Sequence, residues 1–224
     1  MPAKTSQKKF KERQERILKL NAVLKKLFPK AHIALNFSND WELLVAVILS
    51  AQCTDKKVNE ITAGLFKKYS ALDDYVKADP QEFENDIHAA GFFRNKTKNI
   101  LGAARMVKET YGGKLPKTMA EMLHIPGVAR KTGNVVLGNA HGVVEGIAVD
   151  THVLRFVGRF DLSDHKDPVR IERDLMEMLP KKEWYSFTYR VIDYGRTMAP
   201  ARFYDTSKDP LVKIYPPAAK KFRV

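Results

Sequence analysis

Lys131 and Asp150 are the residues of this 224-residue chain whose types and setting point most directly to chemistry. Lys131 follows the turn in LHIPGVARKTGNVVL, residues 123–137, and Asp150 comes nineteen residues later in VDTH. Because Lys131 stands beside Arg130 in the first turn of an expected helix, the helix dipole and the neighbouring cation both disfavour its charged form. A neutral amine forms a Schiff base with an aldehyde carbon. Alone, Lys131 is more simply a surface lysine that contacts phosphate; with Asp150 it suits imine chemistry at a sugar carbon.

Asp150 also has a structural interpretation, as the cap of the helix that follows it. An aspartate at a helix N-terminus accepts backbone N–H bonds and stays ionised. An ionised carboxylate near a sugar can also stabilise a developing oxocarbenium ion, or orient an attacking amine. The combination of Asp150 with Lys131, rather than either residue alone, favours the chemical interpretation.

The turn before Lys131 predicts two antiparallel helices joined by a tight loop. A helix ends near residues 123–124, Pro-Gly-Val-Ala forms the turn, and a second helix runs over 130–140. Gly127 lets the backbone come close to a partner, and the amides at the start of the second helix suit a phosphate whatever the base sequence. An ordinary helical corner is the alternative. The sequence Arg130-Lys131-Thr132 directly after the turn favours the phosphate site.

Helical periodicity dominates the rest of the chain, with no strand pattern and no repeat. The sequence therefore predicts an all-α protein of about ten helices, with irregular structure from Pro200 onwards because of three further prolines. Capping residues, prolines and glycines place the helices. They are expected at 12–28, 41–51, 55–69, 80–91, 95–111, 118–124 and 130–140, from 150, from 168, and at 182–197.

The net charge of +13 lies entirely at the two ends of the chain. Residues 1–30 carry net +8, residues 195–224 carry net +5, and the residues between them are balanced. Basic ends predict a polyanionic partner, with solvated tails as the alternative. They lack the apolar face of a membrane-surface helix, and no apolar run reaches the roughly 18 residues that span a membrane.

Cysteine content bounds the redox chemistry. The one cysteine, Cys53, excludes an intrachain disulfide and any cysteine-rich metal or iron–sulfur site, so no metal ligand is assigned. The N-terminus has charge but no apolar signal region, and a reducing cytosol is the expected location.

Four segments closely resemble the endonuclease III family of helix-hairpin-helix DNA glycosylases: LLVAVILSAQCTDKKVN (43–59), GFFRNKTKNI (91–100), IPGVARKTGNVVLGNAHG (125–142) and IAVDTHVLR (147–155). The resemblance covers roughly residues 15–200. It implies an all-α, two-lobed fold with DNA in the cleft. Residues 33–144 would form a six-helix barrel lobe that contains the hairpin (118–140). Residues 1–32 and 145–224 would form a second helical lobe with a cysteine-free basic tail.

The resemblance also implies roles for single residues. Lys131 resembles the nucleophile that attacks C1′ of the damaged nucleotide, and Asp150 its electrostatic and proton-transfer partner. Gln52 would fill the gap left by the flipped base, and Phe92, where the family often has leucine, would push into the base stack. The residues expected to contact DNA are Gln52, Phe92, Gly127, Ala129, Arg130, Thr132 and Arg196. Asp55 and His152 resemble lesion-pocket residues, although His152 is equally well a hydrogen-bonded structural histidine.

The chain departs from the family pattern at three places. Ala129 stands where glycine is usual, and Gly133 stands where alanine is usual. The family usually carries Cys-x6-Cys-x2-Cys-x5-Cys for a four-iron cluster; here Ala199 aligns with the first cysteine and the tail has none. We expect no cluster. The side chains expected to pack in its place are Phe203, Tyr204, Tyr215, Pro216 and Phe222.

These observations predict a base-excision-repair DNA glycosylase with apurinic/apyrimidinic lyase activity. It would act as a monomer on double-stranded DNA that carries an oxidised pyrimidine such as thymine glycol, or an abasic site, close to the nucleoid in a prokaryote. One alternative keeps the fold and changes the substrate to a mismatch or an alkylated base. The other is a non-catalytic DNA-binding protein, which would need neither Lys131 nor Asp150.

Overall fold

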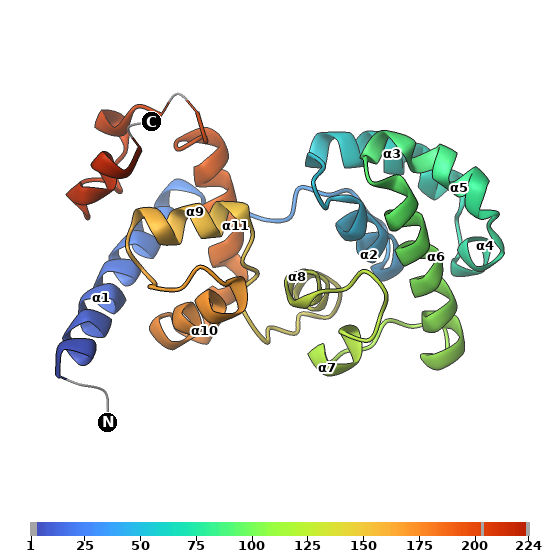
Figure 1. Cartoon of the computed structure of the whole chain (residues 1–224), viewed down its shortest axis with the longest axis horizontal. Helices are drawn as coiled ribbons and strands as arrows, with labels where there is room; N and C mark the ends of the chain where they lie inside the picture. The colour runs from blue at the N-terminus through green and yellow to red at the C-terminus, as the bar shows by residue number, and fades with distance from the viewer. Residues whose placement is uncertain (1–3, 203, 223–224) are drawn as a thin grey trace. The chain divides into compact units, whose positions relative to one another are not determined.

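The structure is a computed structural model that describes the backbone of residues 4–202 and 204–222, and the side chains of 7–202 and 204–220. These residues form eleven α-helices and three 3₁₀ helices, with no strand among them (Figure 1). No described helix has the length and apolarity that a membrane span requires. The chain divides into two compact units: unit 1 comprises 1–32 and 146–224, and unit 2 comprises 33–145. Both basic ends of the sequence belong to unit 1.

Unit 2 is built around one largely buried helix. Every residue from Glu42 to Leu49 of α2 is buried, as the run 43–51 predicts, and α2 packs against α3, α6 and α8. The α-helices of unit 2 are α2 (Asp40–Leu49), α3 (Asp55–Lys68), α4 (Leu72–Lys77), α5 (Pro80–Ile87), α6 (Phe93–Thr110), α7 (Met119–Met122) and α8 (Arg130–His141), and η1 (His88–Ala90) follows α5.

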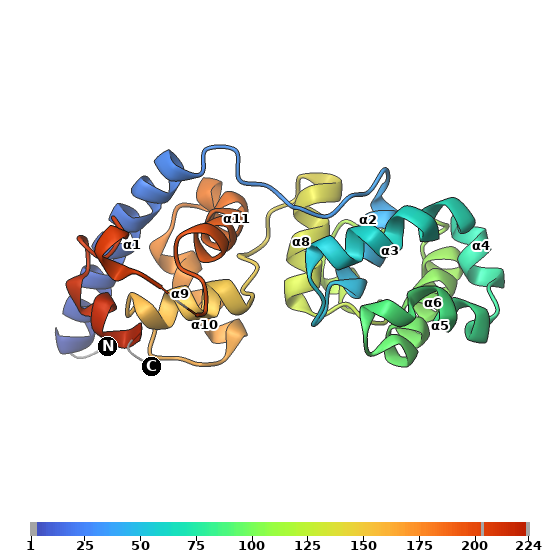
Figure 2. The ribbon, with the colours of Figure 1, turned by 90° about the horizontal axis from the view of Figure 1, so that it is seen from above.

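Unit 1 joins the N-terminal helix to the C-terminal third of the chain. Its α-helices are α1 (Lys4–Leu27), α9 (Thr151–Arg159), α10 (Pro168–Met178) and α11 (Lys181–Thr197). The tail beyond α11 contains η2 (Thr206–Lys208) and η3 (Pro216–Phe222), and it lies beside α1 in both views (Figures 1 and 2). Ile17, Leu20 and Leu24, the apolar stripe of α1, are 0% exposed in the core.

Five of the described helices begin close to the expected positions, each behind a capping side chain. The side chains of Asn39, Asp79, Thr118, Asp150 and Asp167 each accept a hydrogen bond from a backbone N–H in the first turn of the following helix. Two expectations were wrong. Helix α4 was not predicted, and α1 begins at Lys4 instead of residue 12.

The cysteine-free tail contributes to the core of unit 1. Leu211 and Ala218 are 0% exposed, and Tyr204 and Tyr215 pack against the same core. Pro216 is exposed, so the expectation that it packs inward is wrong. Phe203 and the side chain of Phe222 lie outside the described residues.

A buried polar cluster anchors this tail to α9 and α11. The Arg159 Nη2 atom lies 3.4 Å from Asp209 Oδ2, with side chains 2% and 1% exposed. Tyr194 and Tyr204 donate their hydroxyl protons to the same carboxylate, and Asp209 Oδ1 accepts from the Leu211 amide at 2.8 Å. The Arg159 guanidinium also lies 3.8 Å from the centre of the Tyr204 ring. This cluster satisfies the charge of a buried arginine with oxygens from the tail.

Candidate active site

The turn between α7 and α8 has a conformation that requires glycine. Gly127 has φ +80°, and a Cβ atom there would lie 2.9 Å from Cβ of Asn99 on α6. The turn is closed by the Val128 amide, which donates to the Ile125 carbonyl at 3.0 Å. The side chains of Ile125 and Val128 are both buried. The hairpin is therefore fixed to α6, with the start of α8 held in one place.

The two departures in the hairpin are accommodated in different ways. Ala129 is the N-cap of α8 with φ −94° and ψ 172°, an extended conformation that any residue adopts, and its side chain makes no cap hydrogen bond. Gly133 is the point where α8 packs closely on α7. A Cβ atom at Gly133 would lie 2.6 Å from Sδ of Met119. Glycine at this position is thus explained by the methionine opposite it.

Lys131 lies in the first turn of α8 and is exposed, with Arg130 half-buried before it. Thr132, the next residue, is buried at 9% exposed. The exposed amine at the positive end of a helix, next to a rigid hairpin, is an arrangement that favours an anionic ligand.

Asp150, His152 and Arg196 belong to unit 1, whereas Lys131 belongs to unit 2. Asp150 is the N-cap of α9, and its Oδ1 atom accepts from the Val153 amide at 2.8 Å. His152 Nδ1 accepts from Arg155 Nη2 at 3.1 Å, since an arginine can only donate. A Cβ atom at Gly195 of α11 would lie 2.3 Å from that Nδ1. His152 therefore has a packing role in unit 1. Arg196 is exposed in the last turn of α11.

Gln52 and Phe92 share an uncommon backbone conformation. Among the described residues, the non-glycine residues with positive φ are Gln52 (54°), Phe92 (49°) and Asp161 (49°). The left-handed region is sparsely populated by non-glycine residues, and such strain concentrates at functional sites. Gln52 is exposed in the loop between α2 and α3, and Phe92, at 67% exposed, precedes α6. Asp55, the first residue of α3, is half-buried near Gln52 in the sequence.

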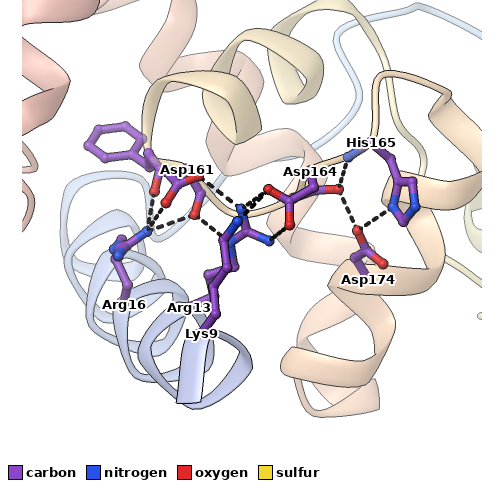
Figure 3. A network of polar contacts seen from close by, with 9 residues as sticks. Lys9, Arg13, Arg16, Asp161, Asp164, His165 and Asp174 are labelled. Carbon is purple, nitrogen blue, oxygen red and sulfur yellow. Dashed lines mark hydrogen bonds and ion pairs between the residues drawn. The ribbon is translucent and has the colours of Figure 1, made fainter. Parts of the chain in front are cut away.

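Part of the basic charge of α1 is used inside unit 1. Arg13 Nη2 lies 2.9 Å from Asp161 Oδ1 and 2.8 Å from Asp164 Oδ1 (Figure 3). Lys9 lies 2.6 Å from Asp164, and Arg16 Nη1 donates to the Asp161 carbonyl at 2.7 Å. The hydrogen bonds from Arg13 and Lys9 hold the pKa of Asp164 well below its usual range. These cations stabilise the docking of α1 on the end of α9, so the charge of residues 1–30 overstates what is available to DNA.

The residues present do not fit the family's iron–sulfur cluster. A four-iron cluster is held by four cysteine thiolates, and the sequence has only Cys53, which lies in unit 2 between α2 and α3. Within the described ranges, no group of three or more His, Cys, Asp or Glu side chains could hold a metal ion. Ala199, aligned with the first cysteine, is 6% exposed in the core of unit 1.

One buried residue near the candidate DNA-contact positions was not identified from the sequence. Lys96 of α6 is 4% exposed, and it is in phase with the buried positions Ile100, Ala103, Ala104 and Val107. The sequence could have indicated Lys96, because it is a lysine on the apolar face of an amphipathic helix.

Comparisons with known proteins agree with these features. Residues 45–181 match the HhH-GPD superfamily of base excision DNA repair proteins. Endonuclease III of Synechocystis sp. is 46% identical over 195 residues, which cover 87% of this chain and 89% of that protein. Endonuclease III of Bacillus subtilis is 43% identical over 189 residues, covering 84% and 86% respectively.

Two solved structures are similar along almost the whole chain. A non-covalent endonuclease III–DNA complex matches with a TM-score of 0.89 at 38% identity, covering 94% of this chain and 99% of that chain. A trapped endonuclease III–DNA covalent intermediate matches with a TM-score of 0.89 at 39% identity and the same coverage. The predicted all-α, helix-hairpin-helix glycosylase fold class is therefore confirmed.

Proposed function

The chain belongs to the endonuclease III family within the HhH-GPD superfamily of base excision DNA repair proteins, and from this premise we propose that Lys131 is its catalytic nucleophile. The protein is a DNA glycosylase with apurinic/apyrimidinic lyase activity. Its proposed substrate is double-stranded DNA that contains an oxidised pyrimidine, with thymine glycol as the test case. It would work as a monomer in the cytoplasm, near the nucleoid.

The proposed reaction proceeds through an imine. The Lys131 amine attacks C1′ of the flipped nucleotide, and the bond from C1′ to the base breaks, so that the base leaves with the electron pair and takes up a proton. Ring opening then breaks the C1′–O4′ bond, O4′ takes up the proton that the amine has lost, and an iminium forms between Nζ and C1′. Loss of a proton from C2′ then expels the 3′ phosphate by β-elimination, and hydrolysis of the imine frees the lysine.

The observation that carries this proposal is the position of Lys131. Its side chain is exposed in the first turn of α8, directly after the Gly127 turn that is fixed against α6. The backbone amides there suit the phosphate next to the lesion, which would set the register of the nucleotide relative to the amine. A relative of the same fold gives a trapped covalent intermediate with DNA, and attack by an amine such as that of Lys131 would form one.

Asp150 is proposed to stabilise positive charge at C1′ and to move the proton. Its Oδ1 atom is held by the Val153 amide, which fixes the orientation of the carboxylate. The described residues of its own unit place no donor on Oδ2. That oxygen is the one we assign to the reaction.

Gln52 and Phe92 are proposed to stabilise the flipped state of the DNA. Filling the vacated space with an amide and separating neighbouring bases with an aromatic ring both offset the energy of unstacking. The left-handed backbone at both residues supports this assignment, because strain of this kind clusters at functional sites. The assignments of Ala129, Arg130, Thr132 and Arg196 to phosphate contact, and of Asp55 and His152 to the lesion pocket, remain proposals that rest on the resemblance.

We also propose that the protein works without an iron–sulfur cluster. The tail side chains Leu211 and Ala218 fill the core of unit 1, and Asp209 neutralises Arg159 there. Apolar packing and one buried ion pair therefore anchor the tail.

The test is borohydride trapping on a duplex with one thymine glycol. The wild-type protein should give a covalent adduct with DNA, and Lys131→Gln should give none. Lys117→Gln is the matched control, since Lys117 is an exposed lysine of the same unit, close to α7. Base release without an adduct would contradict the imine mechanism, and no base release from any oxidised pyrimidine would contradict the substrate class.

A further inference from the structure

We propose that Lys96 is a positioning residue that holds the two backbone segments carrying Gln52 and Phe92 in the conformation needed to insert both side chains into DNA. The inference rests on the function proposed above for these two residues. It adds a third, buried side chain that would act only through the backbone segments it binds. Lys96 is 4% exposed and lies in the first turn of α6.

The Lys96 ammonium joins segments that are distant in sequence. Its Nζ atom donates to the Leu49 carbonyl at 2.8 Å and to the Ala90 carbonyl at 2.9 Å. Leu49 is the last residue of α2, three residues before Gln52, and Ala90 is the last residue of η1, two residues before Phe92. Its own backbone amide donates to the Phe92 carbonyl at 3.1 Å. One residue thus contacts the backbone at the start of both segments.

The electrostatics explain why a lysine can be buried here. Helix α2 has no basic residue in its last turn, so its C-terminal carbonyls lack a cation from their own helix. Lys96 supplies that positive charge from α6 at the negative end of the α2 dipole. Burial lowers the pKa of Lys96, and the nearby Cys53 raises it in part. The cost of removing an ammonium from water is offset by the two carbonyls, which are charge-assisted acceptors.

The conformations of the two segments explain what the contact does. Gln52 lies in a turn closed by the Cys53 amide, which donates to the Ser50 carbonyl at 3.1 Å, and it has φ +54°. Phe92 has φ +49° and follows Gly91 at φ +70°. Left-handed residues cost of order 1–3 kcal/mol each and persist only where the surroundings determine them. Bonds to Leu49 and Ala90 fix the entry to both turns, so both side chains depend on one ammonium.

The experiment compares Lys96→Met with two controls on the same helix. Methionine keeps the length and apolar stem of the side chain and removes the donors. Lys98→Met removes an exposed positive charge two residues away, and Val107→Ala destabilises the buried face of α6 far from both segments. The substrate is a duplex with one thymine glycol and an adjacent 2-aminopurine, whose fluorescence reports unstacking. The same lesion in a single strand, where no gap has to be filled, serves as the second substrate.

Lys96→Met should slow single-turnover base release from the duplex on the order of tenfold or more, and change the single-strand rate by less than about twofold. The unstacking signal should fall with the duplex rate. In a Gln52→Ala/Phe92→Ala background, Lys96→Met should add almost nothing, because the contacts it supports are already absent. Lys98→Met and Val107→Ala should leave the ratio of duplex to single-strand rates unchanged.

Several outcomes would overturn the inference. Equal loss on duplex and single strand, or a full additional loss in the Gln52→Ala/Phe92→Ala background, would mean that Lys96 only stabilises the fold. If Lys96→Met does not fold, Lys96→Gln replaces it, since the amide keeps a donor and should give a partial loss on the duplex alone. A wild-type protein that releases no base from either substrate would instead contradict the proposed function itself.

Discussion

Replacing Asp209 with alanine tests whether a buried ion pair anchors the cysteine-free tail. The carboxylate is 1% exposed and faces Arg159, which is 2% exposed. Asp209→Ala removes the acceptor for Tyr194 and Tyr204, and leaves the arginine buried without a counter-charge. Burial, with the hydrogen bond to Asp209, raises the pKa of Tyr204 to about 12, so this hydroxyl remains a donor that must find another acceptor.

The magnitude follows from the burial of the pair. Removing one partner of a buried ion pair costs about 3–5 kcal/mol, because the remaining charge is uncompensated. For a protein of this size each kcal/mol corresponds to roughly 2–4 °C in Tm, so Asp209→Ala should lower Tm on the order of 10 °C. Asp209→Asn keeps an acceptor for the Leu211 amide, so its Tm should lie between that of Asp209→Ala and that of the wild type.

The assay is thermal unfolding followed by circular dichroism, with Asp205→Ala as the matched control. Asp205 lies in the same tail, but it is exposed, and its contacts are local to η2, with Ser207 and Lys208. Its loss should shift Tm by less than about 2 °C. The double variant Arg159→Met/Asp209→Leu should regain only the part of the loss that comes from the uncompensated charge. The Tyr194 and Tyr204 hydroxyls still lose their acceptor in this variant. A Tm for Asp209→Ala equal to that of Asp205→Ala would refute the reasoning.

Three further predictions concern the hairpin, the acid stability of unit 1 and the missing cluster. Gly133→Ala should destabilise the protein by about 1–3 kcal/mol in urea unfolding despite the higher helix propensity of alanine, because the new Cβ would lie 2.6 Å from Met119 Sδ; Met119→Ala in the same chain should recover part of this. Burial alone would raise the pKa of Glu183, but hydrogen bonds from its basic and amide neighbours lower it to about 2 from 4.5. The carboxylate therefore stabilises unit 1 above pH 4.5, and this contribution should disappear as the pH falls to about 2, and be absent in Glu183→Gln, when urea unfolding is measured across that range. Protein from iron-depleted and iron-replete cells should have the same Tm and the same cleavage rate, and a difference would contradict the cluster-free proposal.

Helix starts were predictable from sequence wherever a single side chain determines them. Asp79 and Asp167 each precede a proline and cap the next helix, and both contacts are local. Helix α4 was missed because six residues are too few for a periodic pattern and its N-cap, Ala71, has no capping side chain. The first turns of α1 were missed because the apolar stripe begins only at Ile17, and the earlier residues are held by ion pairs across unit 1.

The sequence could predict those residues of the candidate site whose positions depend on neighbouring residues of the same helix. The first-turn position of Lys131 and the capping contact of Asp150 follow from the few residues around each. The role of Lys96 could not be found in this way, because its acceptor on Leu49 is 47 residues away. The left-handed backbone at Gln52 could not be predicted either, since no glycine stands at or beside this position to indicate a positive φ.

Lys96 and Arg159 are both buried cations, and the difference between their acceptors decides how each can be replaced. Arg159 faces a side chain, Asp209, so one further substitution removes both charges together. Lys96 faces backbone carbonyls of Leu49 and Ala90, which no substitution removes. Any apolar residue at position 96 leaves these two buried acceptors without a donor, and an unsatisfied buried carbonyl costs about 1–3 kcal/mol. A second substitution at Asp209 can therefore remove the charge imbalance that the loss of Arg159 creates, whereas the loss of Lys96 can be compensated only by another donor at the same point.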